Sequence, residues 1–142
     1  MKLEDIYKEW SVDNLIDKST LDQASIDIPK LHHKYMQFLS KERMVFRVLQ
    51  ENKKKLVQQL EDYYTGKIDG KDIGKEPWQL TETKSSSEKR VETDPSLIEM
   101  NLKIFVQEEK VLALKEIISN INQRNFQIKN AIDFLRWSQG SV

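Results

Sequence analysis

The chain has 142 residues, no cysteine and a charged fraction of 32%, with 23 basic and 23 acidic side chains that give a net charge of zero. This length suits one domain, and the lack of cysteine excludes disulfide bonds, thiol catalysis and cysteine metal sites. A hydrophobic fraction of 38% is low for a compact monomer and favours an extended helical or oligomeric protein. The mixed charges of Met1–Trp10 argue against a signal peptide, and the apolar runs are too short for a membrane span, so we expect a soluble intracellular protein.

The N-terminal segment predicts a short amphipathic helix within residues 2–16. Its apolar side chains are Leu3, Ile6, Tyr7 and Trp10. Residues 1–30 carry seven acidic and four basic side chains, a net charge of −3. Pro29 then marks a first helical turn or a kink, because proline fits the start of a helix and breaks its interior.

A second, long helix is predicted from about Lys30 to Tyr64, and Gly66 is expected to end it in the left-handed conformation. Its apolar seam advances in alternating steps of four and three residues, and seven of its ten positions are apolar. The seam consists of Leu31, Tyr35, Phe38, Glu42, Val45, Leu49, Asn52, Leu56, Gln59 and Tyr63.

This helix is also the most basic part of the chain. Residues 31–60 hold seven basic and two acidic side chains, a net charge of +5, and several of the cations share one edge of the helix. Such a stripe neutralises phosphates, and aromatic rings beside it can stack bases, so the pattern predicts single-stranded nucleic-acid binding; a solvated helix face is the alternative. The candidate binding residues are Lys34, Lys41, Arg43, Arg47, Lys53, Lys54, Lys55, Tyr63, Tyr64 and Lys67.

Three of the four glycines, Gly66, Gly70 and Gly74, lie at or just after the predicted end of this helix. Residues 67–77 are expected to form a flexible loop. Residues 78–93 alternate weakly around Ser85–Ser87 and predict a small β-hairpin or a loop excursion. The chain is therefore divided into a basic N-terminal helical part (1–66), a loop region (67–93) and a C-terminal helical part (94–142).

The last part predicts one long helix from Pro95 to Trp137, with Asp94 or Thr93 as its N-cap. Ten of the twelve positions on its heptad seam are apolar, and a second apolar face, which includes Ile98 and Phe126, runs beside the seam. Packing on the chain's own core explains the seam alone, so the second face favours self-assembly. The candidate assembly residues are Leu97, Ile104, Phe105, Val111, Leu114, Ile118, Ile121, Ile128, Ile132 and Leu135.

Residues for catalysis are scarce. His32 and His33 are adjacent, so they point to different helix faces instead of forming a metal pair. The glycines at 66, 70 and 74 lack the Lys-Ser/Thr of a phosphate-binding loop. We therefore expect no enzyme activity, no metal and no cofactor.

Several short motifs occur in a characteristic order along the chain. They are Leu3-Glu4-Asp5, Ile16-Asp17, Asp62-Tyr63-Tyr64-Thr65-Gly66 with Asp69-Gly70, the segment Val91–Leu97, and the set Arg124, Phe126, Ile128 and Lys129. In order and spacing they resemble the UvsY recombination mediator family of T-even-type phages over essentially the full length.

This resemblance implies a non-enzymatic protein of the infected bacterial cytoplasm that forms a ring of six or seven subunits and binds single-stranded DNA. Its implied role is to help a phage RecA-type recombinase displace the phage single-strand-binding protein. The family has basic residues at two positions that are Gln58 and Leu60 here, and Lys53, Lys54, Lys55 and Lys67 lie near enough to replace them.

The predicted fold is thus mainly α. It has a short N-terminal helix, a long antiparallel helical hairpin and a small β or loop excursion, and it assembles into a ring-like homo-oligomer. A prefoldin-like holdase or scaffold without nucleic-acid binding is the alternative, because it would also combine two long helices with β-hairpins.

Overall fold

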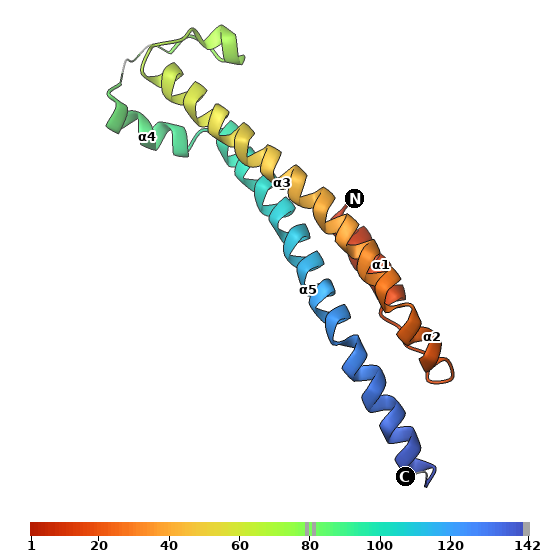
Figure 1. Ribbon diagram of the computed structural model, residues 1–142. Helices are drawn as coiled ribbons and strands as arrows, with labels where there is room; N and C mark the ends of the chain where they lie inside the picture. Colours follow the sequence, from red (N-terminus) through yellow and green to blue (C-terminus); the bar gives the residue numbers. More distant parts are fainter. Residues whose placement is uncertain (79, 81, 141–142) are drawn as a thin grey trace. The chain divides into compact units, whose positions relative to one another are not determined.

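Helices form almost all of the regular structure. The computed structural model describes residues 1–78, 80 and 82–140, and no β-strand occurs among them. The elements are α1 (Leu3–Asp13), α2 (Leu21–Ile26), α3 (Ile28–Tyr64), the 3-10 helix η1 (Gly70–Ile73), α4 (Lys84–Glu92) and α5 (Pro95–Ser138) (Figure 1). The prediction of a mainly helical chain is confirmed. None of the helices in the described part of the chain is apolar over enough of its length to span a membrane.

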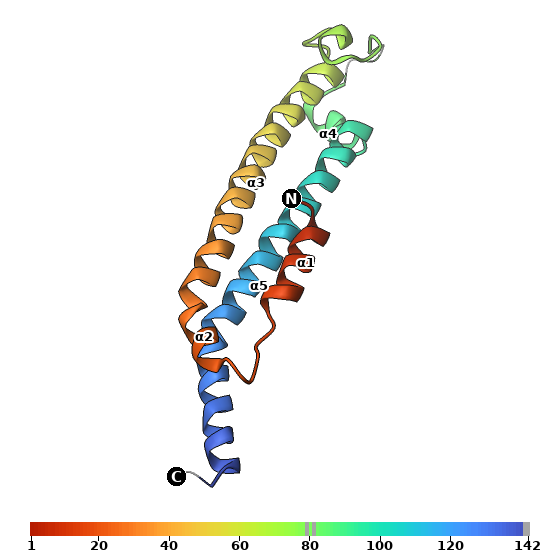
Figure 2. The ribbon, with the colours of Figure 1, turned by 90° about the vertical axis from the view of Figure 1, so that its right-hand side faces the viewer.

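The helices build two compact units. One contains Met1–Arg43 and Glu108–Val142, and the other contains Met44–Gln107. Each unit holds one segment of α3 and one segment of α5, which run in opposite directions (Figures 1 and 2). The units therefore combine residues far apart in sequence, whereas the predicted divisions at 66 and 93 follow chain order.

The ends of the long helices have the predicted chemistry. Gly66 follows α3 with a φ of 79°, a conformation that residues with a Cβ rarely adopt. Asp94 caps α5, since its carboxylate accepts the Ser96 backbone N–H at 2.9 Å. Pro95 is the first residue of α5, where no intrahelical N–H is needed.

The predicted β-hairpin is wrong for the described residues between 78 and 93, because Lys84–Glu92 form α4. The Thr83 hydroxyl accepts the Ser86 backbone N–H at 3.4 Å, so the expected serine turn is the first turn of a helix. Ser87 and Val91 are its buried residues, and their four-residue spacing is helical. Residues 79 and 81 lie outside the described part.

The predicted seam of α3 consists of two rows of residues, each with a spacing of seven, and the structure buries only one of them as predicted. The row that includes Tyr35, Glu42 and Tyr63 is buried as expected. The other row is half-buried at Leu31 and Phe38 but exposed from Val45 onward. The row beside it lies on the inner side of the helix and consists of Leu39, Phe46, Lys53 and Leu60. Between residues 45 and 60 this inner row has two apolar side chains, Phe46 and Leu60, and the other row has only Val45, so burying the inner row removes more apolar surface from water.

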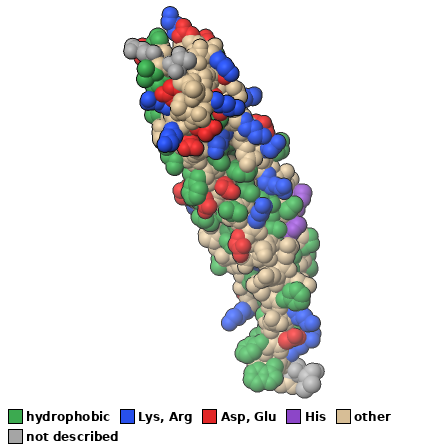
Figure 3. Space-filling model, turned by 90° about the vertical axis from the view of Figure 1, so that its left-hand side faces the viewer, with side chains coloured by type: hydrophobic (Ala, Val, Ile, Leu, Met, Phe, Trp, Pro, Cys, Tyr) green, Lys and Arg blue, Asp and Glu red, His purple; other side chains and the backbone are tan. Residues whose placement is uncertain are grey.

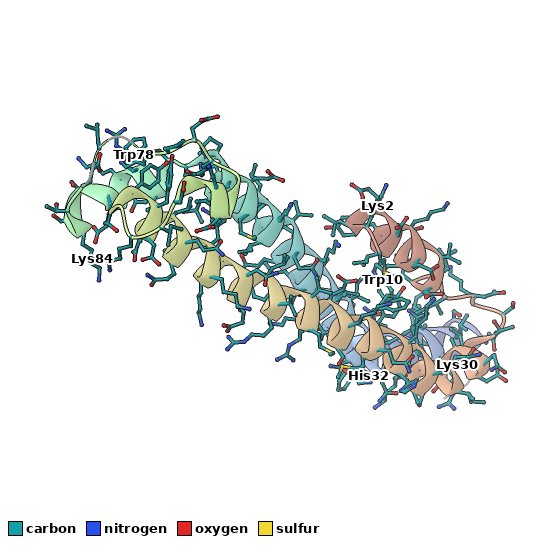
Figure 4. All side chains as sticks on the ribbon, turned by 90° about the horizontal axis from the view of Figure 1, so that it is seen from above. Lys2, Trp10, Lys30, His32, Trp78 and Lys84 are labelled. Atoms are coloured by element: carbon teal, nitrogen blue, oxygen red, sulfur yellow. The ribbon has the colours of Figure 1, made fainter. Side chains whose placement is uncertain are left out.

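In the unit that contains the chain's N-terminus, α1 lies against α3 and α5 (Figures 1 and 2). The Trp10 ring, labelled in Figure 4, meets the Tyr35 ring edge-on at 5.5 Å. The Tyr35 hydroxyl donates to the Asp13 carboxylate at 3.0 Å. Arg124 of α5 is buried and donates to the backbone carbonyls of Asn14 and Leu15, and these bonds satisfy polar groups at the end of α1.

Candidate nucleic-acid interface

Five of the eight predicted cations belong to the second unit, and four of these five lie on its segment of α3. Arg47, Lys54 and Lys55 are exposed, whereas Lys53 is half-buried. Lys67 is exposed in the loop after Gly66. The helix fixes where these side chains leave the backbone, so the exposed ones form a surface that can meet an anionic chain without a change of fold.

One acidic residue lies within this basic surface. A single oxygen of Glu51, Oε1, is 2.9 Å from Nη2 of Arg47 and 3.3 Å from Nζ of Lys54. The spacings of four and three residues that bring these side chains together are visible in the sequence, but the net charge of the helix does not reveal that Glu51 binds two of the cations.

The predicted cations of the first unit differ from one another in exposure and in ion-pair partners. Lys41 and Arg43 are exposed on α3. Lys34 instead binds two carboxylates of α1, Asp13 and Glu9, each at 2.7 Å. Hydrogen bonds to Asp13 and then Glu9 raise the pKa of Lys34 above its ordinary value. The two carboxylates balance the charge of Lys34 and link α1 to α3, which argues against a DNA contact at Lys34.

The predicted stacking role of Tyr63 and Tyr64 is also corrected. Only 5% and 8% of their surfaces are exposed, and both rings pack near Trp78, at 5.9 and 4.8 Å between centroids (Figure 4). The Tyr63 hydroxyl donates to the Glu76 carbonyl at 2.6 Å. The two rings hold the loop against the end of α3, so they offer no face to a base.

Asp94 is the polar centre of this packing. Its side chain is fully buried, and it binds Nζ of Lys75 at 2.8 Å and the Tyr64 hydroxyl at 2.8 Å. Burial opposes ionisation of Asp94, but the bonds from Lys75, Ser96 and Tyr64 outweigh it and lower its pKa to about 2. The sequence indicated Asp94 only as a helix cap, because its partners come from three separate segments.

The two positions where the resemblance called for basic residues have different surroundings. Gln58 is exposed, and its amide donates to Asp62 at 3.0 Å. Leu60 has no exposed surface and packs in the core of the second unit. A cation could be accommodated at position 58 of this chain and not at position 60.

The candidate assembly residues are mostly buried in their own chain. Phe105 is exposed, Ile104, Ile132 and Leu135 are half-buried, and the buried members are Leu97, Val111, Leu114, Ile118, Ile121 and Ile128. The seam therefore forms the cores of the two units. The exposed apolar side chains of α5 are Ile98, Leu102, Phe105 and Val106 in the second unit and Leu112, Phe126, Phe134 and Trp137 in the first.

Hydrophobic side chains are visible on the surface beside the C-terminal end of α5 (Figure 3). Phe134 and Trp137 lie with their rings 5.9 Å apart, and both are more than half exposed. A group of exposed aromatic side chains often marks an interaction surface, whereas a single exposed apolar side chain needs no explanation. We call the set Phe126, Phe134 and Trp137 the C-terminal aromatic face.

A family model described as "Recombination, repair and ssDNA binding protein UvsY" matches residues 9–141. The chain belongs to the UvsY family. The family and the helical fold agree with the resemblance that the motifs indicated. No curated protein matches the chain.

Solved structures of a UvsY protein have the same fold. One crystal structure of the bacteriophage T4 recombination mediator protein UvsY, in lattice type IV, matches with a TM-score of 0.85 at 20% identity over 96% of this chain and 99% of that chain. Another, in lattice type II, has a TM-score of 0.84 at 22% identity over 98% of each chain. The likeness thus covers both units, although few residues are identical.

Proposed function

We propose that this member of the UvsY family is a recombination mediator that binds single-stranded DNA as an oligomer. In this proposal it loads a phage RecA-type recombinase onto DNA covered by the phage single-strand-binding protein, in the cytoplasm of the infected host. The family match over residues 9–141 carries the proposal. It is a binding function that needs no catalytic group, metal or cofactor.

The exposed cations of α3 support the DNA-binding step. Lys41 and Arg43 in one unit, and Arg47, Lys54 and Lys55 in the other, are exposed, and exposed cations can neutralise phosphates. Exposed cations on a helix surface contact phosphates and carry no information about base edges, so we expect weak sequence preference. Because Tyr63 and Tyr64 are buried, phosphate contacts account for most of the affinity.

Removing two of these cations is expected to halve the salt dependence of binding. Contacts through Lys41, Arg47, Lys54 and Lys55 give a slope of log affinity against log salt of about −2.8, since each phosphate contact on a single strand contributes about 0.7. Lys54→Gln with Lys55→Gln should lower the slope to about −1.4. Titration of a fluorescent oligonucleotide between 50 and 200 mM salt measures it.

The matched control replaces Lys84 and Lys89, two exposed lysines of α4, with glutamine. It changes the net charge equally, so its slope should stay at the parent's value. If both double variants flatten the slope alike, the DNA surface includes α4 and the α3 surface is not distinct.

Assembly into a homo-oligomer, proposed here as a ring of about six or seven subunits, would use exposed apolar surface. The C-terminal aromatic face is its best candidate, because unsatisfied apolar area of this kind is removed from water when a second copy covers it. Many weak strand contacts, one set per subunit, then act together and hold DNA against a competing binding protein.

Phe126→Ser with Trp137→Ser is expected to give a folded protein of lower mass in sedimentation experiments. Both side chains are more than half exposed, so the urea midpoint should change little. With DNA precoated by single-strand-binding protein, this variant should shorten the lag of the recombinase ATPase less than the parent does. A monomeric variant that relieves the lag fully would exclude multivalent capture.

Substitutions on the seam serve as the contrasting control. Ile118→Asp with Ile121→Asp places two carboxylates in the core of the first unit, so we expect unfolding and not selective dissociation. Circular dichroism separates the two outcomes.

A prefoldin-like holdase is the second candidate, because the exposed apolar side chains of α5 could bind unfolded clients. It would leave the exposed cations of α3 without a role. Suppression of aggregation of an unfolded client, with no salt-dependent binding to oligonucleotides, would favour it over the mediator.

A further inference from the structure

The surface of α3 that is proposed to bind DNA contains a carboxylate, that of Glu51. Glu51 shares the outward side of α3 with Arg47 and Lys54, and its Oε1 atom accepts from both at 2.9 and 3.3 Å. The side chains of both cations are 68% exposed and that of Glu51 is 43% exposed. The three therefore lie on the surface where a DNA strand would approach, and none of them is held by the core.

A DNA phosphate would bind the same N–H groups that now point at Glu51. To do so, it must either displace the carboxylate or approach it at close range, and both lower the affinity. With Glu51 in place, the group of three carries one net positive charge, whereas Arg47 and Lys54 alone would carry two. Stability gives no reason for this arrangement, because exposed ion pairs on a helix contribute little to it.

We infer that Glu51 acts as an intramolecular competitor of DNA phosphates that keeps the affinity of each subunit for single-stranded DNA low. This inference rests on the proposed function. A protein that transfers a strand to a recombinase must release it, and most changes of affinity at one interface appear in the dissociation rate. Glu51 makes each contact short-lived, and the number of subunits restores retention of the strand.

Glu51→Gln keeps the size of the side chain and removes its charge. We expect the variant to bind a short oligonucleotide about 3- to 10-fold more tightly, since two exposed ion pairs no longer compete. We also expect slower dissociation, because Arg47 and Lys54 then bind phosphate without a neighbouring carboxylate that competes for the same N–H groups. Stopped-flow dissociation and oligonucleotide titration measure these effects with the full chain.

Two further variants exclude a general charge effect. Glu88→Gln makes the same change in net charge at an exposed residue of a different helix, α4, and its affinity should match the parent's. In a chain that carries Arg47→Gln and Lys54→Gln, adding Glu51→Gln should give no gain, because the residues through which Glu51 acts are gone.

The outcomes separate this inference from the proposed function. If the parent shows no salt-dependent binding, the proposed function itself fails. If the parent binds but Glu51→Gln binds equally or more weakly, Glu51 orients the two cations for DNA and the inference is overturned. A gain that persists without Arg47 and Lys54 overturns it as well, since Glu51 would then act only by repelling the strand.

Discussion

Leu60→Arg is expected to destabilise the second unit by about 3–5 kcal/mol, although arginine would supply the basic residue that the resemblance implies at this position. Leu60 has no exposed surface and packs with Tyr63, Tyr64, Val91 and Leu97. A guanidinium there would lose its hydration without gaining a carboxylate, and the neighbouring rings would have to move apart. Urea unfolding followed by tyrosine and tryptophan fluorescence measures the loss.

Gln58→Arg is the matched control, two residues away on an exposed part of α3. Its effect on stability should lie within about 0.5 kcal/mol, as for most surface substitutions. It should bind single-stranded DNA more tightly than the parent, whereas the Leu60 variant should bind less because less of it is folded. Equal urea midpoints for the parent and Leu60→Arg would show that position 60 is not a core position.

Asp94→Asn is expected to lower the free energy of unfolding at pH 7 by about 2–4 kcal/mol. The carboxylate is fully buried and accepts from Lys75, Tyr64 and Ser96. An asparagine keeps the shape but leaves the Lys75 ammonium without a counter-charge, and its NH2 group faces donors. The end of α3, the loop and the start of α5 would lose their common polar contact.

The effect of Asp94 should depend on pH in a defined direction. Its pKa is lowered from 3.8 to about 2 in the folded chain, so ionised Asp94 contributes about 2 kcal/mol above pH 4. As the pH falls, the unfolded chain takes up a proton first, so this contribution declines below pH 4, is roughly half gone at pH 3 and is lost below pH 2.

The difference in unfolding free energy between the parent and Asp94→Asn should therefore narrow from pH 7 to pH 3. Tyr64→Phe keeps the ion pair with Lys75 and serves as the comparison, with a smaller loss at pH 7. A parent-to-variant difference that stays constant over this range would show that the stability does not come from the ionised carboxylate.

Much of the architecture was determined by local sequence. The heptad pattern after Pro95 and the capping residue Asp94 predicted α5 almost to its ends, and Gly66 marked the end of α3. Helix boundaries of this kind depend on hydrogen bonds and backbone conformations within a few residues, which sequence spacing reveals directly. The exposed cations Arg47, Lys54 and Lys55 were identified for the same reason, since a strongly basic helix face is local.

The errors arose where contacts between distant segments decide the outcome. Residues 84–92 are short and polar, so their pattern could not distinguish a hairpin from α4, and the burial of Ser87 and Val91 decides it. Tyr63 and Tyr64 looked suited to stacking because they end a basic helix, but Trp78 and Asp94 enclose them. Lys34 counted toward the basic stripe until α1 brought Glu9 and Asp13 to it.

The sequence by itself determined that the chain is helical, that two long helices have apolar seams and that α3 is basic. Only the tertiary structure decided which side chains remain accessible. It buries Ile118, Ile121 and Leu60 in the cores of the units, and it leaves Phe126, Trp137 and the group around Glu51 on the surface. The reason is that a periodic pattern fixes the angle of a side chain around its own helix, whereas burial depends on which distant segments cover that side.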